Sequence, residues 1–311
     1  MTGVVEGKDG WLFLAGGMNN AERIYKDPHF LPKGWASQWS TLIKSRQLMT
    51  AQIGAQYLHL IAPEKTSIYP ELFPEPLPLY GRHPCGYLSG LQRPDLLGSI
   101  IDPSLAFMQE KYKRDVYLRN DSHWNIFGAQ IVVNLAMQRL GYEQRIDVEA
   151  LSFHEHTMVG DLANKLPDRR SEARALVRIS PFLKRSFANK IVAYNECYRG
   201  QRPAIHVGGA ASFTNSSPTA IDQRVLIFGD SYSGYEAGGL THLFAELFRK
   251  VQFVWSQNVD TGLLQTLSPD ILITEGAERF MSRVPNDRFD LSSFVNEKLA
   301  EAETAWTSRS A

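Results

Sequence analysis

Residues 225–233 read Val225-Leu226-Ile227-Phe228-Gly229-Asp230-Ser231-Tyr232-Ser233, and this stretch decides the fold. Its first four residues are apolar and predict a buried strand that ends at Gly229, while residues 235–249 continue in a helical pattern. A buried strand followed by a glycine, a small polar cluster and a helix is typical of a layered α/β domain with a mostly parallel sheet. Catalytic groups in such sheets gather at the carboxyl ends of strands, which is where Ser231 would lie.

The rest of the chain repeats this alternation of short apolar runs and helical patterns. Further strands are expected at residues 57–62, 116–118, 251–255 and 271–274, and further helices at residues 38–53 and 126–140. The Arg-rich residues 169–185 are expected to form a helical insertion or a solvated face, and the Pro-rich residues 70–84 an extended loop beside the site or a connector. We expect one domain over residues 1–290, with residues 151–219 as a candidate insertion and residues 291–311 as a C-terminal helix or tail.

Composition narrows the classes of function. The 33 basic residues balance the 33 acidic ones, so no global field would attract a polyanion, and we expect no nucleic-acid partner. Cys85 and Cys197 are the two cysteines, lack zinc-ligand spacing and are expected to be free thiols. The amino terminus has no apolar run long enough for a signal peptide or membrane span. As the sequence stands we therefore expect a cytoplasmic protein, and a periplasmic one if the sequence is a trimmed part of an exported chain.

Ser231 is the candidate nucleophile. A serine at the start of a helix lies near backbone N–H groups and the positive end of a helix dipole, and both stabilise an anionic tetrahedral intermediate. The alternative is that Asp230 or Ser231 only caps the following helix. A serine hydroxyl also needs a base, so a catalytic role requires a histidine that a carboxylate orients.

A second polar cluster, Asn120-Asp121-Ser122-His123-Trp124-Asn125, supplies such a pair. It follows one expected strand and precedes one expected helix. A carboxylate two residues before an imidazole can accept its Nδ1–H and leave Nε2 free to take the serine proton. Because both polar clusters follow strands of a parallel sheet, we expect Ser231, His123 and Asp121 to meet at one sheet edge.

These two clusters and four further segments, in this order along the chain, resemble the AlgX and AlgJ family of polysaccharide O-acetyltransferases, a branch of the SGNH hydrolase-like superfamily. The further segments are Gly7-Lys8-Asp9-Gly10-Trp11-Leu12-Phe13, Ala62-Pro63-Glu64-Lys65-Thr66-Ser67-Ile68-Tyr69-Pro70, Gly160-Asp161-Leu162-Ala163 and Asp270-Ile271-Leu272-Ile273-Thr274-Glu275-Gly276-Ala277-Glu278-Arg279-Phe280. The resemblance implies an SGNH-hydrolase-like three-layer sandwich with a mostly parallel central sheet. It also implies acyl transfer from a donor to a glycan without a cofactor, and a membrane-bound O-acyltransferase as a candidate partner.

The same resemblance implies roles for individual residues. Ser231 would accept the acyl group, His123 would act as general base and acid, and Asp121 would orient His123. The backbone N–H groups of Ser231 and Tyr232 are candidates for the oxyanion site, although the Tyr232 ring could instead pack in the core. Asp230 and Arg279 are further candidates for oxyanion or substrate contacts. Arg279 would either order a loop through an ion pair with Glu278 or form a surface pair of little energetic value.

Three other functions fit parts of the sequence. A metal-dependent hydrolase could use Asp121, His123, His154, His156 and Asp230 as ligands, but the further ligands that a two-metal site needs after strand ends are missing. A non-catalytic scaffold could bind glycan through Trp11, Trp35, Trp39 or Tyr80, although an intact Ser, His and Asp set argues against a dead site. A carbohydrate esterase or deacetylase would share the acyl-enzyme and use water as acceptor. We expect no metal, and the resemblance favours transfer to a glycan.

Overall fold

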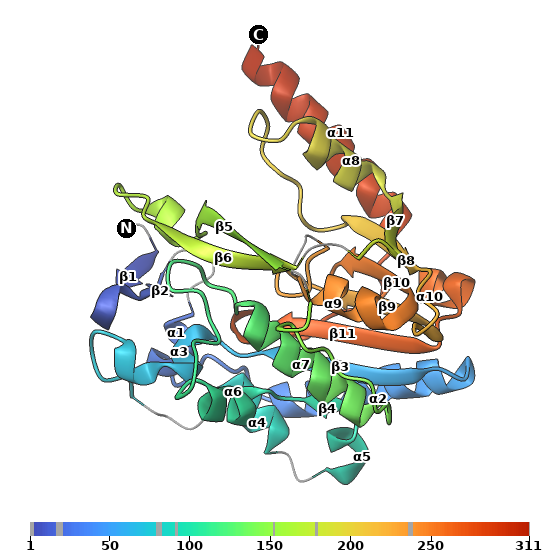
Figure 1. Cartoon of the computed structure of the whole chain (residues 1–311), viewed down its shortest axis with the longest axis horizontal. Coiled ribbons are helices and arrows are strands. Elements are labelled where there is room, and N and C mark those ends of the chain that lie inside the picture. Colours follow the sequence, from blue (N-terminus) through green and yellow to red (C-terminus); the bar gives the residue numbers. More distant parts are fainter. Residues whose placement is uncertain are drawn as a thin grey trace.

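The computed structural model describes residues 3–16, 21–78, 83–90, 93–151, 153–177, 180–235 and 239–310. Its centre is a seven-stranded sheet with the order β4-β3-β11-β9-β10-β8-β7 (Figure 1). The strands are β3 (Gln56–Ala62), β4 (Ile100–Ile101), β7 (Leu183–Ala188), β8 (Ala210–Asn215), β9 (Ile221–Gly229), β10 (Phe248–Trp255) and β11 (Ile271–Ala277). All pairings from β4 to β10 are parallel, whereas β8 pairs antiparallel with both β10 and β7. The expected mostly parallel α/β sheet is confirmed.

Helices lie on both faces of this sheet (Figure 1). The helices are α1 (Arg23–Lys26), α2 (Trp35–Gln52), α3 (Lys65–Ile68), α4 (Pro84–Ser89), α5 (Pro94–Leu97), α6 (Ser104–Glu110), α7 (Ile126–Arg139), α8 (Lys190–Cys197), α9 (Leu240–Leu247), α10 (Thr261–Leu267) and α11 (Leu291–Ser310). Among the described residues, none of the helices is long and apolar enough to cross a bilayer.

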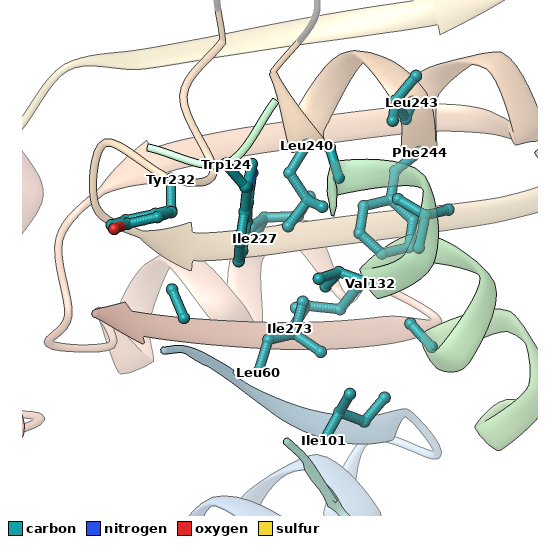
Figure 2. Close-up of a cluster of buried hydrophobic side chains, with 14 of the residues drawn as sticks. Leu60, Ile101, Trp124, Val132, Ile227, Tyr232, Leu240, Leu243, Phe244 and Ile273 are labelled. Carbon is teal, nitrogen blue, oxygen red and sulfur yellow. The ribbon is translucent and has the colours of Figure 1, made fainter. Parts of the chain in front are cut away.

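The central strand β9 shows why the sheet needs two covering layers. Val225 and Ile227 are buried in the cluster that contains the inner faces of α7 and α9, whereas Leu226 and Phe228 are buried in the cluster that contains α2 and α10. Successive side chains of a strand point to opposite faces, so a run of four apolar residues demands cover on both. Figure 2 shows Ile227 beside Ile273 of β11, with Val132 of α7 against them. Burial of each such side chain stabilises the fold by about 1.5–3 kcal/mol.

Two antiparallel hairpins lie outside the main sheet. One pairs β1 (Val4–Glu6) with β2 (Leu12–Leu14), and the other pairs β5 (Phe153–Val159) with β6 (Ser171–Val177). Both hairpins contact the segment that contains His123: Leu12 N–H donates to the carbonyl of Arg119 at 3.0 Å, and Gly160, which follows β5, lies against Asn120.

Three sequence expectations about local structure are wrong, and a fourth is decided between its two alternatives. Residues 169–185 contain β6 and the start of β7, so the helical insertion is wrong. The described side chains of these strands are mostly exposed or half-buried, as expected of a solvated face. Residues 116–118 form no strand; Tyr117 makes an isolated antiparallel bridge with Trp124. The helix expected over residues 235–249 spans only Leu240–Leu247, and the apolar run continues directly into β10. Ser231 consequently lies in a turn, so a helix N-terminus does not begin at that residue.

The remaining expectations concern loops and aromatic residues. Trp35 and Trp39 are buried in the core, which leaves them unable to stack on a sugar. Trp11 is also buried, and Tyr80 lies outside the described residues. Within the Pro-rich region, Pro70–Leu72 form a 3₁₀ turn and Pro84 begins α4. Residues 291–310 form one helix, α11, that packs near α8 (Figure 1).

Candidate active site

Ser231 follows the carboxyl end of β9, where the strand turns away from the sheet. It is partly exposed, and its Oγ lies 2.7 Å from Nε2 of His123. Gly229, the last residue of β9, permits this turn because a Cβ there would lie 2.7 Å from the Glu275 carboxylate. The strand end thus brings the serine hydroxyl to the imidazole.

His123 lies in a tight loop rather than at the end of a strand. The N–H of Leu118 donates to the carbonyl of His123 at 3.1 Å, and the N–H of Asn125 donates to the carbonyl of Val116 at 3.0 Å. These two hydrogen bonds close the loop on either side of the bridge between Tyr117 and Trp124. The Asn125 side chain then caps α7 by accepting the N–H groups of Phe127 and Gly128. These contacts fix the backbone on both sides of the imidazole.

Asp121 holds the imidazole from the opposite side to Ser231. Its Oδ1 accepts Nδ1–H of His123 at 2.6 Å and the backbone N–H of His123 at 2.9 Å. Its Oδ2 accepts the backbone N–H of Asp161 at 2.9 Å. These three donors fix the carboxylate. In the neutral imidazole the proton is on Nδ1, so the unprotonated Nε2 faces the hydroxyl of Ser231.

The electrostatics of this pair favour charge on both partners. Burial alone would raise the pKa of Asp121, but the His123 charge and the hydrogen bonds to the carboxylate outweigh it and hold that pKa far below its ordinary value. Burial alone would lower the pKa of His123, but the Asp121 carboxylate outweighs it and raises that pKa above its ordinary value. The arrangement therefore stabilises an imidazolium, which is what a base needs once it has taken a serine proton.

The β5–β6 hairpin supplies two carboxylates that sequence reasoning missed as site residues. The Asp161 carboxylate accepts the N–H of Ser122 at 2.6 Å and its hydroxyl at 2.8 Å. The Glu172 carboxylate accepts the N–H groups of Arg119 at 2.8 Å and Asn120 at 2.7 Å. Together they hold the backbone that leads into the Asp121 and His123 pair. The Gly160-Asp161 dipeptide was the one signal in the sequence, since it belongs to a segment that resembles the family.

Gly160 is required at this contact. A Cβ on Gly160 would lie 2.2 Å from the carbonyl oxygen of Asn120 and 2.9 Å from Cβ of Asp121. A side chain there would push the hairpin away from the polar loop. Gly160 is therefore the residue that lets the Asp161 N–H reach the Asp121 carboxylate.

Tyr232 packs behind the imidazole. Its ring is buried and lies 4.7 Å from the Trp124 ring between centroids (Figure 2). The centroid of the His123 ring is also 4.7 Å away, and the Tyr232 hydroxyl donates to the carbonyl of Ser122 at 2.8 Å. Its backbone N–H donates to Asp230 Oδ1 at 3.1 Å. An oxyanion site built from the Ser231 and Tyr232 N–H groups would therefore need Asp230 to release or share the second donor.

The Asp230 carboxylate holds the turn that contains Ser231, called here the nucleophile turn, by accepting several hydrogen bonds. Besides Tyr232, its carboxylate accepts the N–H of Ala277 at 2.9 Å and the side-chain amide of Gln257 at 3.2 Å. Its own N–H donates to Glu275 Oε2 at 2.9 Å. Burial and the neighbouring Asp230 charge raise the pKa of Glu275 well above its ordinary value.

Arg279 is buried and pairs with Glu64, with Nη1 3.3 Å from Oε2. The expected ion pair with Glu278 is wrong, because the two residues lie side by side on a 3₁₀ turn and Glu278 contacts His83 instead. The Arg279 guanidinium lies 5.4 Å from the centroid of the Tyr232 ring. It thus supports the ring that packs on His123.

The ligands that the alternative of a metal-dependent hydrolase would use are not brought together as a set. Asp121 and His123 group with Asp161, all three offering ligand atoms within 4.8 Å of one another. His154 and His156 are exposed on β5, and neither they nor Asp230 belong to a group of three candidate ligands within the described residues. The carboxylates of Asp121 and Asp161 already accept the hydrogen bonds given above.

The family described as "SGNH hydrolase-like domain, acetyltransferase AlgX" matches residues 4–190 of this chain. The probable alginate O-acetylase AlgJ of Pseudomonas aeruginosa is 33% identical over 185 residues, which are 53% of this chain and 41% of that protein. The probable alginate O-acetylase AlgJ of Azotobacter vinelandii is 34% identical over 142 residues, 42% of this chain and 31% of that protein. This chain therefore matches less than half the length of these two relatives.

Two solved structures share the fold. The O-acetyltransferase domain of Pseudomonas putida AlgJ has a TM-score of 0.58 at 18% identity, and the match covers 94% of this chain and 98% of that one. Bacillus cereus PatB1 has a TM-score of 0.64 at 14% identity, and the match covers 90% of this chain and 97% of that one. At such low identity these likenesses concern the fold alone.

Proposed function

Because this chain belongs to the family of SGNH hydrolase-like domains described for the acetyltransferase AlgX, we propose that it transfers an acetyl group to a hydroxyl of a glycan through a serine acyl-enzyme. The observation that carries the proposal is the line of contacts from Ser231 Oγ to His123 Nε2 and from His123 Nδ1 to Asp121. A nucleophile, a base and a group that orients the base are the parts that acyl transfer requires.

The geometry supports the following sequence of steps. Ser231 Oγ attacks the carbonyl carbon of the acyl donor while its proton passes to His123 Nε2. The tetrahedral intermediate collapses as the donor's C–O bond breaks, and His123 returns the proton to the leaving oxygen. A glycan hydroxyl then attacks the acyl-enzyme, gives its proton to Nε2 and releases Ser231, which recovers that proton. Asp121 stabilises the imidazolium in both halves of the reaction.

The remaining candidate residues act on this site in different ways under the proposal. The Ser231 N–H is the oxyanion donor, and the Tyr232 N–H joins it when the Asp230 carboxylate shifts. Arg279 carries a buried positive charge behind Tyr232 and acts through that ring rather than by contact with the acyl group. No metal or cofactor takes part in the proposed chemistry.

The partners follow from the same family membership. We propose a small-molecule or protein-borne acyl donor, a polysaccharide acceptor and a membrane-bound O-acyltransferase that supplies the acetyl group. An acceptor assembled outside the cytoplasm would place the protein in the periplasm. Relatives named for alginate are the reason to begin acceptor tests with acidic oligosaccharides.

A product assay tests the proposal. The purified chain is incubated with p-nitrophenyl acetate, with and without oligosaccharides of uronic acids and of neutral sugars, and products are analysed by mass spectrometry. Acetylated oligosaccharide that forms with the wild type and not with Ser231→Ala supports transfer. Release of acetate alone, unchanged by every acceptor, would make the protein an esterase, and an absence of turnover in both forms would contradict the proposal.

A further inference from the structure

Three metal-ligating side chains meet outside the Ser231, His123 and Asp121 set. His83 lies at the N-cap of α4, Cys85 lies in the first turn of that helix, and Glu278 follows the end of β11. A ring nitrogen of His83, the Sγ atom of Cys85 and a carboxylate oxygen of Glu278 all lie within 4.8 Å of one another. Cys85 and Glu278 are fully buried, while 33% of the His83 side chain is exposed.

The Glu278 carboxylate is fixed in a definite orientation. Its Oε2 accepts the N–H of Glu64 at 2.9 Å and the hydroxyl of Ser67 at 2.6 Å. Its Oε1 lies 2.9 Å from Nδ1 of His83 and 3.4 Å from the N–H of Cys85. One oxygen is therefore held by the protein, and the other faces the imidazole and the thiol.

The His83 ring is also held in place. It packs directly on Gly86, where a Cβ would lie 2.9 Å from Nε2 and 3.0 Å from Cε1 of the ring. The absence of a side chain at Gly86 lets the imidazole lie against the backbone of α4 with Nδ1 toward Glu278. Side chains whose orientation is fixed before a ligand arrives are typical of binding sites.

We propose that His83, Cys85 and Glu278 bind one zinc ion, with a water molecule as the fourth ligand on the exposed side of His83. Zinc favours nitrogen, sulfur and carboxylate ligands in tetrahedral geometry, with bonds of about 2.0–2.3 Å, which separates ligand atoms by about 3.3–3.6 Å. The three ligand atoms lie within 4.8 Å of one another, so small side-chain movements can bring them to that spacing. The 2.9 Å between Nδ1 and Oε1 has to open by a few tenths of an ångström, which the partly exposed imidazole can provide.

The charges of the zinc-bound site suit a buried position. With Zn²⁺, a neutral imidazole, a thiolate and a carboxylate, the site sums to zero. Binding therefore removes the thiol proton and leaves no net charge in the protein interior.

The proposed ion would tie α4 to the end of β11. Glu278 immediately precedes Arg279, which supports the Tyr232 ring, so the site belongs to the same scaffold as the nucleophile turn. It shares no ligand with the Ser231, His123 and Asp121 set. The role is structural, and its test does not depend on acyl transfer.

Metal content and spectroscopy test the proposal on the full chain. The apoprotein is loaded with ZnSO₄, dialysed and analysed by plasma mass spectrometry, and a second portion is loaded with CoCl₂. We expect one zinc per chain and, with cobalt, a thiolate-to-metal charge-transfer band. Cobalt bound without that band would lie at a site without Cys85, for example Asp121, His123 and Asp161, and would overturn the proposal.

Two variants separate this site from adventitious thiol binding. Cys197→Ser removes the other, exposed cysteine and should keep the full zinc content and the charge-transfer band. His83→Gln removes a ligand at a partly exposed position, so folding should survive, and zinc affinity should fall at least about tenfold. Chelation should lower the thermal midpoint of wild type and Cys197→Ser but not of His83→Gln. Two results would contradict the proposal: wild type that retains no zinc, or His83→Gln that binds zinc as tightly as wild type. The cluster would then be only a contact between His83 and Glu278 beside the buried Cys85 thiol.

Discussion

His123 Nε2 lies 2.7 Å from Ser231 Oγ, although 108 residues separate the two along the chain. The contact joins the end of β9 to a loop held by the β5–β6 hairpin, so its geometry depends on three separate parts of the fold. This direct contact places the base where it can take the serine proton at the moment of attack.

Replacing His123 by Ala should lower kcat/KM for an activated acetyl ester by a factor on the order of 10³ or more, because members of a triad act as a unit. Asp121→Asn should cost the same or less. Initial rates with p-nitrophenyl acetate measure both, and circular dichroism checks the fold. His156→Ala is the matched control, since that histidine is exposed on β5 and should leave the rate unchanged. A folded His123→Ala protein with nearly full activity would exclude His123 as the base.

The pH profile should carry the signature of the Asp121 carboxylate. His123 must be neutral to accept the serine proton, and Asp121 raises its pKa, so kcat/KM should fall as the pH drops through a value above the ordinary histidine pKa of about 6.5. Asp121→Asn removes the negative charge and should move this acid limb to lower pH. Rates measured from pH 5 to 9 resolve a shift of this acid limb on the order of one pH unit. An acid limb that does not move in Asp121→Asn would show that another group controls it.

Asp161 should act as a positioning residue. Asp161→Ala removes the acceptors for the N–H and hydroxyl of Ser122 but keeps the backbone N–H that reaches Asp121, so the loop should loosen without loss of the triad. We expect kcat to fall by about 10- to 100-fold with little change in KM, because small displacements of a catalytic group are costly. Asp161→Asn should recover part of the loss. Glu155→Ala, exposed on the same hairpin, is the control, and an equal loss there would point to general damage to β5.

Gly160→Ala should disturb the same contact by volume alone. The added Cβ would lie 2.2 Å from the Asn120 carbonyl oxygen, so the backbone of one segment must move, at a cost of about 1–3 kcal/mol. We expect a lower free energy of unfolding in urea together with a lower kcat. Gly98→Ala introduces the same methyl group where no atom lies within 4 Å, and it should change neither quantity. Equal behaviour of the two variants would mean that the hairpin adjusts freely.

The nucleophile turn and the histidine pair could be predicted because each is continuous in sequence. Four apolar residues precede the turn with Ser231, and Asp121 lies two residues before His123. A local sequence pattern therefore reveals each of these two segments. The supporting carboxylates could not be predicted in the same way. Asp161 acts on a residue 39 positions away, and Glu64 meets Arg279 across 215 positions. No periodicity relates residues so far apart, and only the folded sheet brings them together.

The helical alternative for residues 169–185 is wrong for a different reason. This region contains β6 and the start of β7, whose side chains are largely exposed or half-buried, so apolar residues do not mark one face. Arginine is also a good helix former, which biases a reading based on propensity. Hydrogen bonding to a neighbouring strand decides the structure here, and that partner is not visible in the local sequence.

The position of the acyl group during turnover tests the central claim most directly. Wild-type protein is mixed with p-nitrophenyl acetate, quenched in acid within the first turnover, digested and mapped by mass spectrometry, and a sulfonyl fluoride serves as a stable substitute for the acyl group. The account predicts one adduct, on the peptide that contains Ser231, and none there in Ser231→Ala. Ester turnover with the adduct on another residue, or turnover that persists in folded Ser231→Ala, would contradict it.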